Sequence, residues 1–151
     1  QCHSEIAIRA SVSELRRMMQ QTGSASLANA DITFLASDVM TGSNVVARLR
    51  ELEIASVATF APDNQERRRE KMAFYMGDAR IKATTLHSFK GWEAPLLVVH
   101  IDEAASPQSL ALIYAGLTRL KRRATGSSLT VVCSAQELLE FGRAWPEFIE
   151  I

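Results

Sequence analysis

The feature that most constrains the fold is the alternation of short apolar runs with segments of helical pattern. Runs rich in apolar and β-branched residues lie at positions 31–37, 54–60, 80–86, 95–101 and 128–133. Helical spacing or helix-start signals occur between and beyond them. Strands that alternate with helices form parallel sheets, because each return to the same end of the sheet requires a crossover. The sequence therefore predicts an α/β fold, with a mostly parallel sheet and helices on both faces.

The first two predicted helices carry apolar residues at intervals of three or four. The first helix ends at a Gly/Ser/Ala stretch, residues 23–28, and its apolar positions are Val12, Leu15, Met18 and Met19. The segment Thr41-Gly42-Ser43 is expected to cap a second helix, whose apolar face comprises Val45, Val46, Leu49 and Leu52.

Three further helices are predicted in the rest of the chain. The mixed-charge segment 65–71 indicates a solvated helix rather than the alternative, a phosphate-binding patch. Residues 107–122 form a helix whose buried stripe is Leu110, Ile113, Leu117 and Leu120. A last helix begins at Ala135, with Ser134 as its N-cap.

Length and composition limit the class of protein. With 151 residues, 47% of them hydrophobic, the chain suits one domain, residues 1–151, and is too short for two ordinary ones. No apolar run approaches the roughly 18 residues of a membrane span. The start at Gln1 shows neither an initiator Met nor a signal peptide, so we expect a soluble piece of a longer protein. The isolated residues Cys2 and Cys133 indicate no disulfide or zinc site, and a reducing, cytoplasmic setting.

The charge composition excludes a protein that binds nucleic acid through a large overall positive charge. The 17 basic and 17 acidic residues give a net charge of zero. Any contact with nucleic acid must therefore be local.

Residues 84–93 carry an unusual density of chemistry for a connecting loop. This segment follows a predicted strand and reads Thr84-Thr85-Leu86-His87-Ser88-Phe89-Lys90-Gly91-Trp92-Glu93. Loops at the carboxyl ends of parallel strands form the ligand crevice of open α/β sheets. Gly91 would permit a tight turn or a close approach to a ligand. The sequence thus predicts a binding site here.

The same loop resembles motif V of UvrD/PcrA/Rep-like superfamily 1 DNA helicases, T-x-H-x-x-K-G-L-E. Trp92 stands where Leu is commoner, and Ala94 where Phe is frequent. The resemblance implies the second RecA-like domain of such an enzyme, a P-loop NTPase-like fold that lacks the P-loop. It also implies that Gly91 and Glu93 lie toward the nucleotide, and that the DNA-binding residues are Thr85, His87, Ser88 and Lys90. Trp92 is interpreted as a packing residue, with base stacking as the alternative.

A second segment, residues 114–121, resembles motif VI of the same family, Y-V-A-L-T-R-A. It reads Tyr114-Ala115-Gly116-Leu117-Thr118-Arg119-Leu120-Lys121, so Arg119 matches the family arginine and Leu120 replaces Ala. The resemblance implies that Arg119 is catalytic and binds nucleotide, reaching across a domain cleft to the γ-phosphate as an arginine finger. The alternative is that Arg119, with Lys121, Arg122 and Arg123, only complements the dipole of a helix end. Two motifs in the family order favour the catalytic interpretation.

Residues 96–103 resemble a Walker B strand, because an apolar run ends there in Asp102-Glu103. None of the four lysines follows a glycine, so the chain has no GxxxxGK[ST] loop. Asp102 and Glu103 are therefore predicted to be loop or helix-start residues, and His100 a hydrogen-bonded core or edge histidine. ATP and Mg²⁺ would be held only in the full-length enzyme, beside an N-terminal P-loop domain of the same chain, and no metal site is expected here.

The sequence analysis thus predicts the C-terminal motor domain of an ATP-dependent DNA helicase, inactive as an isolated fragment. Its partners would be single-stranded DNA and the P-loop domain, with no membrane. One alternative is a non-catalytic α/β module that binds nucleic acid or protein. Another is a small-molecule enzyme using Ser88, His87 and Asp102, although no third residue is placed to orient His87 beside Ser88.

Overall fold

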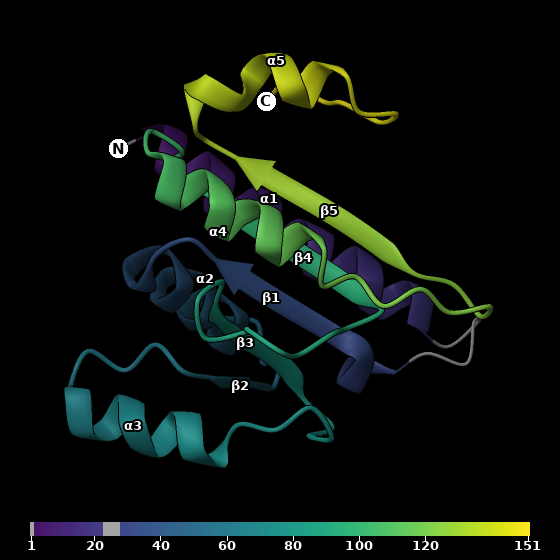
Figure 1. The fold of residues 1–151 in the computed structure, drawn as a ribbon. Helices are drawn as coiled ribbons and strands as arrows, with labels where there is room; N and C mark the ends of the chain where they lie inside the picture. The colour runs from purple at the N-terminus through teal and green to yellow at the C-terminus, as the bar shows by residue number, and fades with distance from the viewer. Residues whose placement is uncertain (1, 23–27) are drawn as a thin grey trace.

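The centre of the protein is a five-stranded parallel sheet, seen in a computed structural model that describes residues 2–22 and 28–151 (Figure 1). The strand order is β2-β3-β1-β4-β5. The strands are β1 (Ile32–Ala36), β2 (Ser56–Ala58), β3 (Ile81–Thr85), β4 (Leu96–Ile101) and β5 (Ser128–Cys133). Every pairing is parallel. The predicted α/β class, with a parallel sheet, is therefore confirmed.

The central strands are buried on both faces. All five residues of β1 and all six of β4 are buried, as continuous apolar runs in parallel sheets generally are. The edge strands β2 and β5 are only partly buried. The interior of the sheet therefore lies along β3, β1 and β4.

Helices α1 (Cys2–Gln21) and α2 (Val39–Glu51) cover one face of the sheet. Their predicted apolar positions pack there as expected: Val12, Leu15, Met18, Val45 and Leu49 are buried, with Met19 and Val46 at the margin. A polar contact adds to this packing, since the Ser11 hydroxyl lies 2.9 Å from Nδ1 of buried His100. The first helix ends before the predicted Gly/Ser/Ala stretch, of which residues 23–27 lie outside the described part.

The opposite face is covered by α4 (Pro107–Leu117) and by the segment after β3. Ile113 of α4 packs with Leu86, Phe89 and the side chains that β1 and β4 direct toward this face of the sheet. Gly116 allows this contact, because a Cβ there would lie 2.1 Å from Cδ2 of Leu86. The helix and the loop after β3 are therefore packed directly on each other.

Outside these two layers lie shorter elements: the 3-10 helices η2 (Asn29–Asp31) and η3 (Gln136–Leu138), and the helices α3 (Asn64–Ala73) and α5 (Leu139–Arg143). Helix α3 confirms the predicted solvated helix, since none of its residues is buried. Asp63 caps it by accepting hydrogen bonds from the backbone of residues 65 and 66.

Several predicted helix boundaries are wrong. Helix α2 starts earlier than expected, because the Asp38 carboxylate accepts a hydrogen bond from the Thr41 amide and is the actual N-cap. Helix α4 ends at Leu117, five residues before the predicted position 122. After β5, a 3-10 turn precedes α5, and Ser134 caps neither element.

Two predicted core positions are also wrong. Leu52 is 40% exposed because it lies past the last residue of α2, and Leu110 is 44% exposed on the outer side of α4. Within the described helices, none is both long enough and apolar enough to cross a membrane.

Candidate functional site

The loop after β3 is anchored by buried apolar side chains. Leu86 continues the strand by donating its amide to the Ala36 carbonyl of β1, and the Phe89 side chain is fully buried beneath the loop. Backbone hydrogen bonds from Phe89 to Thr85 and from Trp92 to Phe89 then form successive turns. The conformation of the loop is therefore fixed by its own buried side chains and backbone hydrogen bonds.

The predicted DNA-binding residues of this loop fall into two kinds. Thr85 and Ser88 bond to each other, because the Thr85 hydroxyl donates to the Ser88 hydroxyl at 3.0 Å and also accepts the Ser88 amide at 3.2 Å. His87 and Lys90 are exposed, and neither forms a side-chain hydrogen bond or ion pair with the described residues. Two of the four thus fix the turn, whereas the other two face solvent.

Gly91 and Glu93, predicted to lie toward a nucleotide, are exposed. Gly91 has φ of +86°, a left-handed conformation that glycine adopts without strain, and no atom lies within 4 Å of the position a Cβ would take. The backbone at Gly91 is therefore open to an approaching molecule.

Arg119 lies in the turn after α4, which corrects its predicted place on the helix. Thr118 is the C-cap, and no basic residue lies in the last turn of α4. Arg123 instead pairs with Asp31 at 2.8 Å. The four cations therefore do not complement the helix end as a group, but Arg119 itself does, since its Nε donates to the carbonyl of Ala115 in the last turn of α4. This alternative role of Arg119 stays open beside the catalytic one.

The turn containing Arg119 is joined to the end of the β3 loop by backbone hydrogen bonds. The Ala94 amide donates to the Arg119 carbonyl at 3.1 Å, and the Lys121 amide donates to the Ala94 carbonyl at 2.9 Å. Ala94 and Leu120 form an isolated parallel bridge. The two segments that resemble helicase motifs are thus one continuous piece of structure.

A small hollow of about 100 Å³ lies where these segments meet. Its walls comprise Leu86, Phe89, Lys90, Ala115 and Arg119, so two cationic side chains border it. Gly91 and Glu93 do not line it. The hollow is well below the roughly 300 Å³ of the smallest usual ligand pockets, so this surface alone does not enclose a nucleotide.

The Arg119 side chain is held at its base and free at its tip. Its Nε donates to the Ala115 carbonyl at 3.0 Å. Among the described residues, no acceptor is bonded to its terminal nitrogens. The guanidinium is therefore oriented by the protein yet keeps donors for an external anion.

The end of the Walker B-like run is a structural network. Asp102 and Glu103 lie in the loop after β4, as predicted. The Ser37 hydroxyl donates to Asp102 at 3.1 Å, and His100 Nε2 lies 3.2 Å from the other carboxylate oxygen. Burial is the largest single influence on Asp102 and raises its pKa, but the interactions with His100, Asp38 and Thr41 together outweigh burial and hold the pKa below the usual range. The prediction that His100 is a bonded core histidine is confirmed.

Sequence reasoning missed Ser11 and Ser37 in this network. Ser11 is fully buried and binds His100 from α1. The sequence feature that could have indicated the role of Ser11 is its position as a small polar residue beside the apolar stripe of the first helix.

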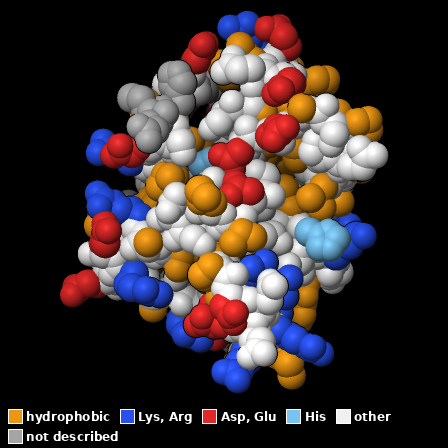
Figure 2. All heavy atoms as spheres, turned by 90° about the vertical axis from the view of Figure 1, so that its left-hand side faces the viewer, with side chains coloured by type: hydrophobic (Ala, Val, Ile, Leu, Met, Phe, Trp, Pro, Cys, Tyr) orange, Lys and Arg blue, Asp and Glu red, His pale blue; other side chains and the backbone are white. Residues whose placement is uncertain are grey.

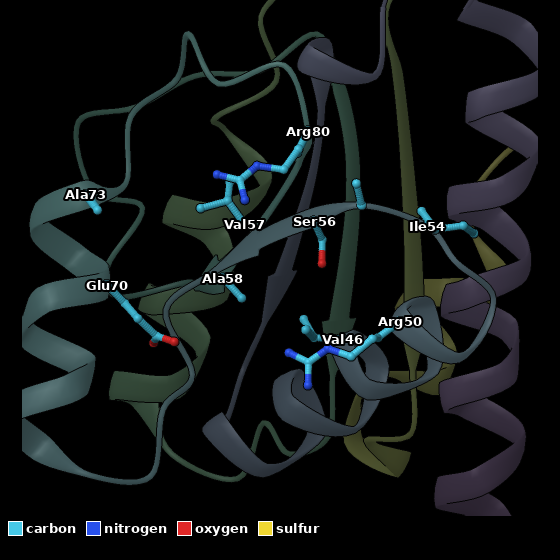
Figure 3. Close-up of a pocket in the computed structure, with 10 residues that line it drawn as sticks. Val46, Arg50, Ile54, Ser56, Val57, Ala58, Glu70, Ala73 and Arg80 are labelled. Carbon is cyan, nitrogen blue, oxygen red and sulfur yellow. The ribbon is translucent and has the colours of Figure 1, made fainter.

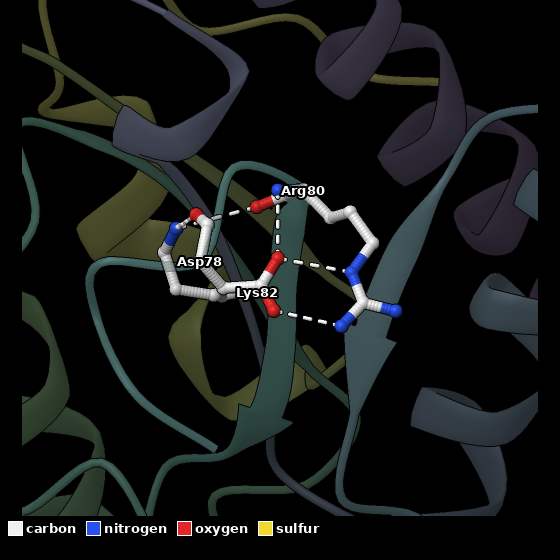
Figure 4. Close-up of polar contacts among 3 residues, drawn as sticks. All are labelled: Asp78, Arg80 and Lys82. Carbon is white, nitrogen blue, oxygen red and sulfur yellow. Dashed lines mark hydrogen bonds and ion pairs between the residues drawn. The ribbon is translucent and has the colours of Figure 1, made fainter. Parts of the chain in front are cut away.

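A further polar cluster lies at the N-terminal end of β3 (Figure 4). Arg80 binds both carboxylate oxygens of Asp78, at 2.9 and 2.7 Å, and these hydrogen bonds hold the pKa of Asp78 well below its usual range. The buried Lys82 ammonium donates to the carbonyls of Asp78 and Arg80. Burial lowers the pKa of Lys82.

The surface at the carboxyl ends of the strands carries charges of both signs (Figure 2). Acidic side chains lie near its centre as well as at its margins, whereas Lys and Arg side chains lie mostly toward the margins. Any anionic ligand on this side is therefore favoured away from the acidic centre.

Comparison with known proteins gives a similarity in architecture only. No protein-family model matches the chain, and no curated protein matches it. The chain is similar to a solved structure described as the C-terminal part of the Fun30 ATPase domain, with 8% identity and a TM-score of 0.49. The alignment covers 84% of this chain and 41% of the other, so the chain spans about two-fifths of that protein's length. A likeness at this level says nothing about individual residues or activity.

Proposed function

We propose that this chain acts as the second motor domain of an ATP-dependent DNA helicase or translocase of the UvrD-like superfamily 1 type. It would supply Arg119 and the loop after β3 to an ATP site shared with a P-loop domain. The observation that carries the proposal is the backbone junction at Ala94, which unites the two motif-like segments beside one hollow.

The state of Arg119 supports a role in trans. A permanently charged, planar donor set stabilises charge on a transferring phosphoryl group only if it is oriented beforehand. The hydrogen bond from Nε to the Ala115 carbonyl orients the side chain without using its terminal donors. Arg119 is therefore suited to complete a site whose other half comes from another domain.

The turn between β1 and α2 supports the need for that other domain. In a P-loop protein, backbone amides at such a helix start hold phosphates. Here the Asp38 carboxylate accepts the Thr41 amide at that position, and its charge opposes a phosphate. ATP and Mg²⁺ would therefore be held by a P-loop partner, where ATP supplies the transferable phosphoryl group.

The loop after β3 would couple this site to single-stranded DNA. Lys90 and His87 are exposed cationic or titratable side chains suited to backbone phosphates, and Thr85 and Ser88 fix the turn that presents them. Gly91 and Glu93 would approach the nucleotide from the same turn. Because Ala94 bonds to the Arg119 segment, displacement of either segment would be transmitted to the other.

A small-molecule hydrolase is less well supported. Asp102 is engaged with Ser37 and His100, and the Ser88 hydroxyl accepts a hydrogen bond from Thr85. Among the described residues His87 forms no hydrogen bond with Ser88 or Asp102, so the three are not arranged as a catalytic triad.

The test is DNA-stimulated ATP hydrolysis by the full-length protein that contains this chain and a P-loop domain. Arginine fingers contribute roughly 10³ to 10⁵ in turnover, so Arg119→Ala is expected to lose about that factor while still binding single-stranded DNA. Arg122→Ala is the matched control, since Arg122 is an exposed arginine three positions along. Similar turnover in both variants would reject Arg119 as the catalytic arginine.

A further inference from the structure

Residues 139–151, which we call the C-terminal segment, display large apolar side chains on the surface. None of these residues is buried. Two of the apolar side chains are mostly open to solvent, since Phe141 is 69% exposed and Ile149 is 79% exposed. The complete set of exposed large apolar residues in this segment is Phe141, Trp145, Phe148, Ile149 and Ile151. Apolar side chains gathered in this way mark an interaction surface.

The C-terminal segment has a defined shape, because it turns back along α5 (Figure 1). The ring of Phe148 lies over Gly142 of α5, where a Cβ would be 3.2 Å from Cε2 of that ring. Arg143, also on α5, lies 3.8 Å from the carboxylate of Glu150. The returning chain is therefore held against the helix, and the segment presents its apolar side chains as one formed surface.

The same segment is acidic. It carries Glu140, Glu147 and Glu150 against the single Arg143, so its net charge is −2. Arg143 pairs with Glu140 and Glu150, but this pairing leaves the net charge unchanged. Glu147 forms no ion pair with the described residues. A surface that complements the C-terminal segment would therefore be basic around an apolar centre.

Helix α3 directs its carboxylates toward the sheet. Figure 3 shows Glu70 and Ala73 pointing from α3 toward β2, across a hollow of about 410 Å³. The Glu70 carboxylate accepts the Ala61 amide there. Glu66 lies one turn before Glu70 and thus on the same inner side of the helix. The opposite side of α3 consequently carries none of the acidic residues of this helix.

This opposite side, which we call the basic face of α3, has an apolar centre. Arg68 and Arg69 lie one turn before Met72, and Lys71 lies one turn after Arg68. Met72 is 81% exposed. The three cationic side chains are exposed, and none forms a hydrogen bond or ion pair with a described residue. The basic face thus matches the C-terminal segment in charge and in apolar character.

The two surfaces cannot meet within one molecule. Helix α3 borders β2 at one edge of the sheet, and the C-terminal segment follows β5 at the other edge (Figure 1). The strands β3, β1 and β4 lie between these edges. Contact between the surfaces therefore requires a second copy of the chain, and it joins two different surfaces in a heterologous interface.

We propose that the C-terminal segment of one copy docks on the basic face of α3 of a second copy, so that the protein associates head to tail. The apolar side chains of the segment cover Met72, and its carboxylates lie among the three cations. Because a helix of 10 residues offers a small contact area, the association is weak. This inference does not depend on the proposed motor function, since it uses none of the motif-like residues.

The first test is the weight-average mass of the protein in sedimentation equilibrium. For a contact of this strength the protein concentration is raised to about 1 mM. The mass is expected to rise above the monomer value with concentration. It is expected to return toward the monomer value as NaCl is raised from about 50 to 500 mM, because salt screens exposed charges. A mass that stays at the monomer value at every concentration overturns the inference.

Two double variants test the two surfaces separately. Arg68→Glu with Arg69→Glu alters the basic face, and Phe141→Ser with Ile149→Ser alters the C-terminal segment. Each double variant is expected to weaken the association at least about tenfold. All four side chains are exposed, so the urea midpoint is expected to match that of the wild type. Undiminished association in either double variant contradicts the proposed contact.

Matched controls separate this contact from non-specific attraction. Arg16→Glu with Arg122→Glu changes the charge by the same amount at exposed arginines outside both surfaces. Met40→Ser with Tyr114→Ser removes exposed apolar side chains outside both surfaces. Both control proteins are expected to associate as the wild type does. Losses equal to those of the test variants would reject a specific head-to-tail contact.

Mixing the two test variants gives the sharpest result. One variant keeps an intact C-terminal segment, and the other keeps an intact basic face of α3. Together they are expected to form a 1:1 complex, although each alone associates weakly or not at all. Failure to form this complex would show that the two surfaces do not bind each other.

Discussion

The two ends of strand β3 carry polar clusters of opposite kind. At its N-terminal end, Asp78, Arg80 and Lys82 use one another's side chains and carbonyls as partners. At its C-terminal end, His87 and Lys90 project to solvent without polar side-chain partners among the described residues. The polar groups of the N-terminal cluster find their hydrogen-bond partners within the folded chain. The side chains of His87 and Lys90 at the C-terminal end remain available to bind another molecule.

The difference teaches where to look for function in this fold. A polar group whose hydrogen bonds are complete contributes to structure, and its burial or pKa shift needs no ligand to explain it. A polar group that is fixed by an ordered loop and left unpaired costs no reorganisation when a ligand arrives. The contrast between the two ends of β3 therefore depends on the loop after β3 being rigid.

The largest expected effect tests that rigidity through Phe89. Because its fully buried ring anchors the loop, Phe89→Ala should lower the free energy of unfolding by about 3–5 kcal/mol, measured by urea denaturation. Trp92→Ala, at a residue that is 38% exposed in the same loop, should cost less than about 1 kcal/mol. If both variants were equally mild, the loop would not be anchored from within.

A smaller effect is expected at Gly91, where the backbone conformation itself is tested. Since φ is +86°, Gly91→Ala should destabilise the protein by about 1–2 kcal/mol although a Cβ there meets no neighbour. Gly91→Asn should cost less, because asparagine tolerates this conformation. Equal stability of the Ala variant and the wild type in urea would contradict a fixed left-handed turn.

The smallest expected effect lies at the N-terminal end of β3 and appears as a pH dependence. Burial lowers the pKa of Lys82 in the folded state, so the folded protein loses this proton before the unfolded chain does. Stability therefore rises as pH increases through the folded pKa toward the ordinary lysine value of about 10.4. In Lys82→Met this contribution is absent, so the variant's stability relative to wild type should fall as pH rises toward the ordinary lysine value, measured by urea denaturation at a series of alkaline pH values. Parallel stability curves would show that Lys82 titrates normally.

The strand alternation predicted most of the fold because the central strands are buried on both faces and read as uninterrupted apolar runs. Helix ends were harder to predict. Asp38 caps α2 by accepting the Thr41 amide, although the Thr41 segment itself had offered a local capping signal. The early end of α4 has a tertiary cause, since the Ala94 backbone competes for residues 119–121.

The candidate site was predictable in its residues and not in its geometry. Sequence placed the polar density after β3 and singled out Arg119, but it gave no means of separating Thr85 and Ser88, which bond internally, from Lys90, which does not. Lys82 was not singled out, because a lysine in a strand pattern carries no local sign of burial. Only the register with neighbouring strands makes it interior.

The position of α1 has a consequence for how the protein is made. Ser11 of α1 contacts His100, and Glu14 accepts a hydrogen bond from Thr130 of β5, 116 residues further along the chain. Helix α1 precedes β4 and β5 in the chain, so it can complete these contacts only after both strands have been synthesised. Contacts of such large sequence separation slow folding. Until then α1 can pack only against earlier elements such as β1 and α2, so part of its apolar stripe stays exposed during synthesis.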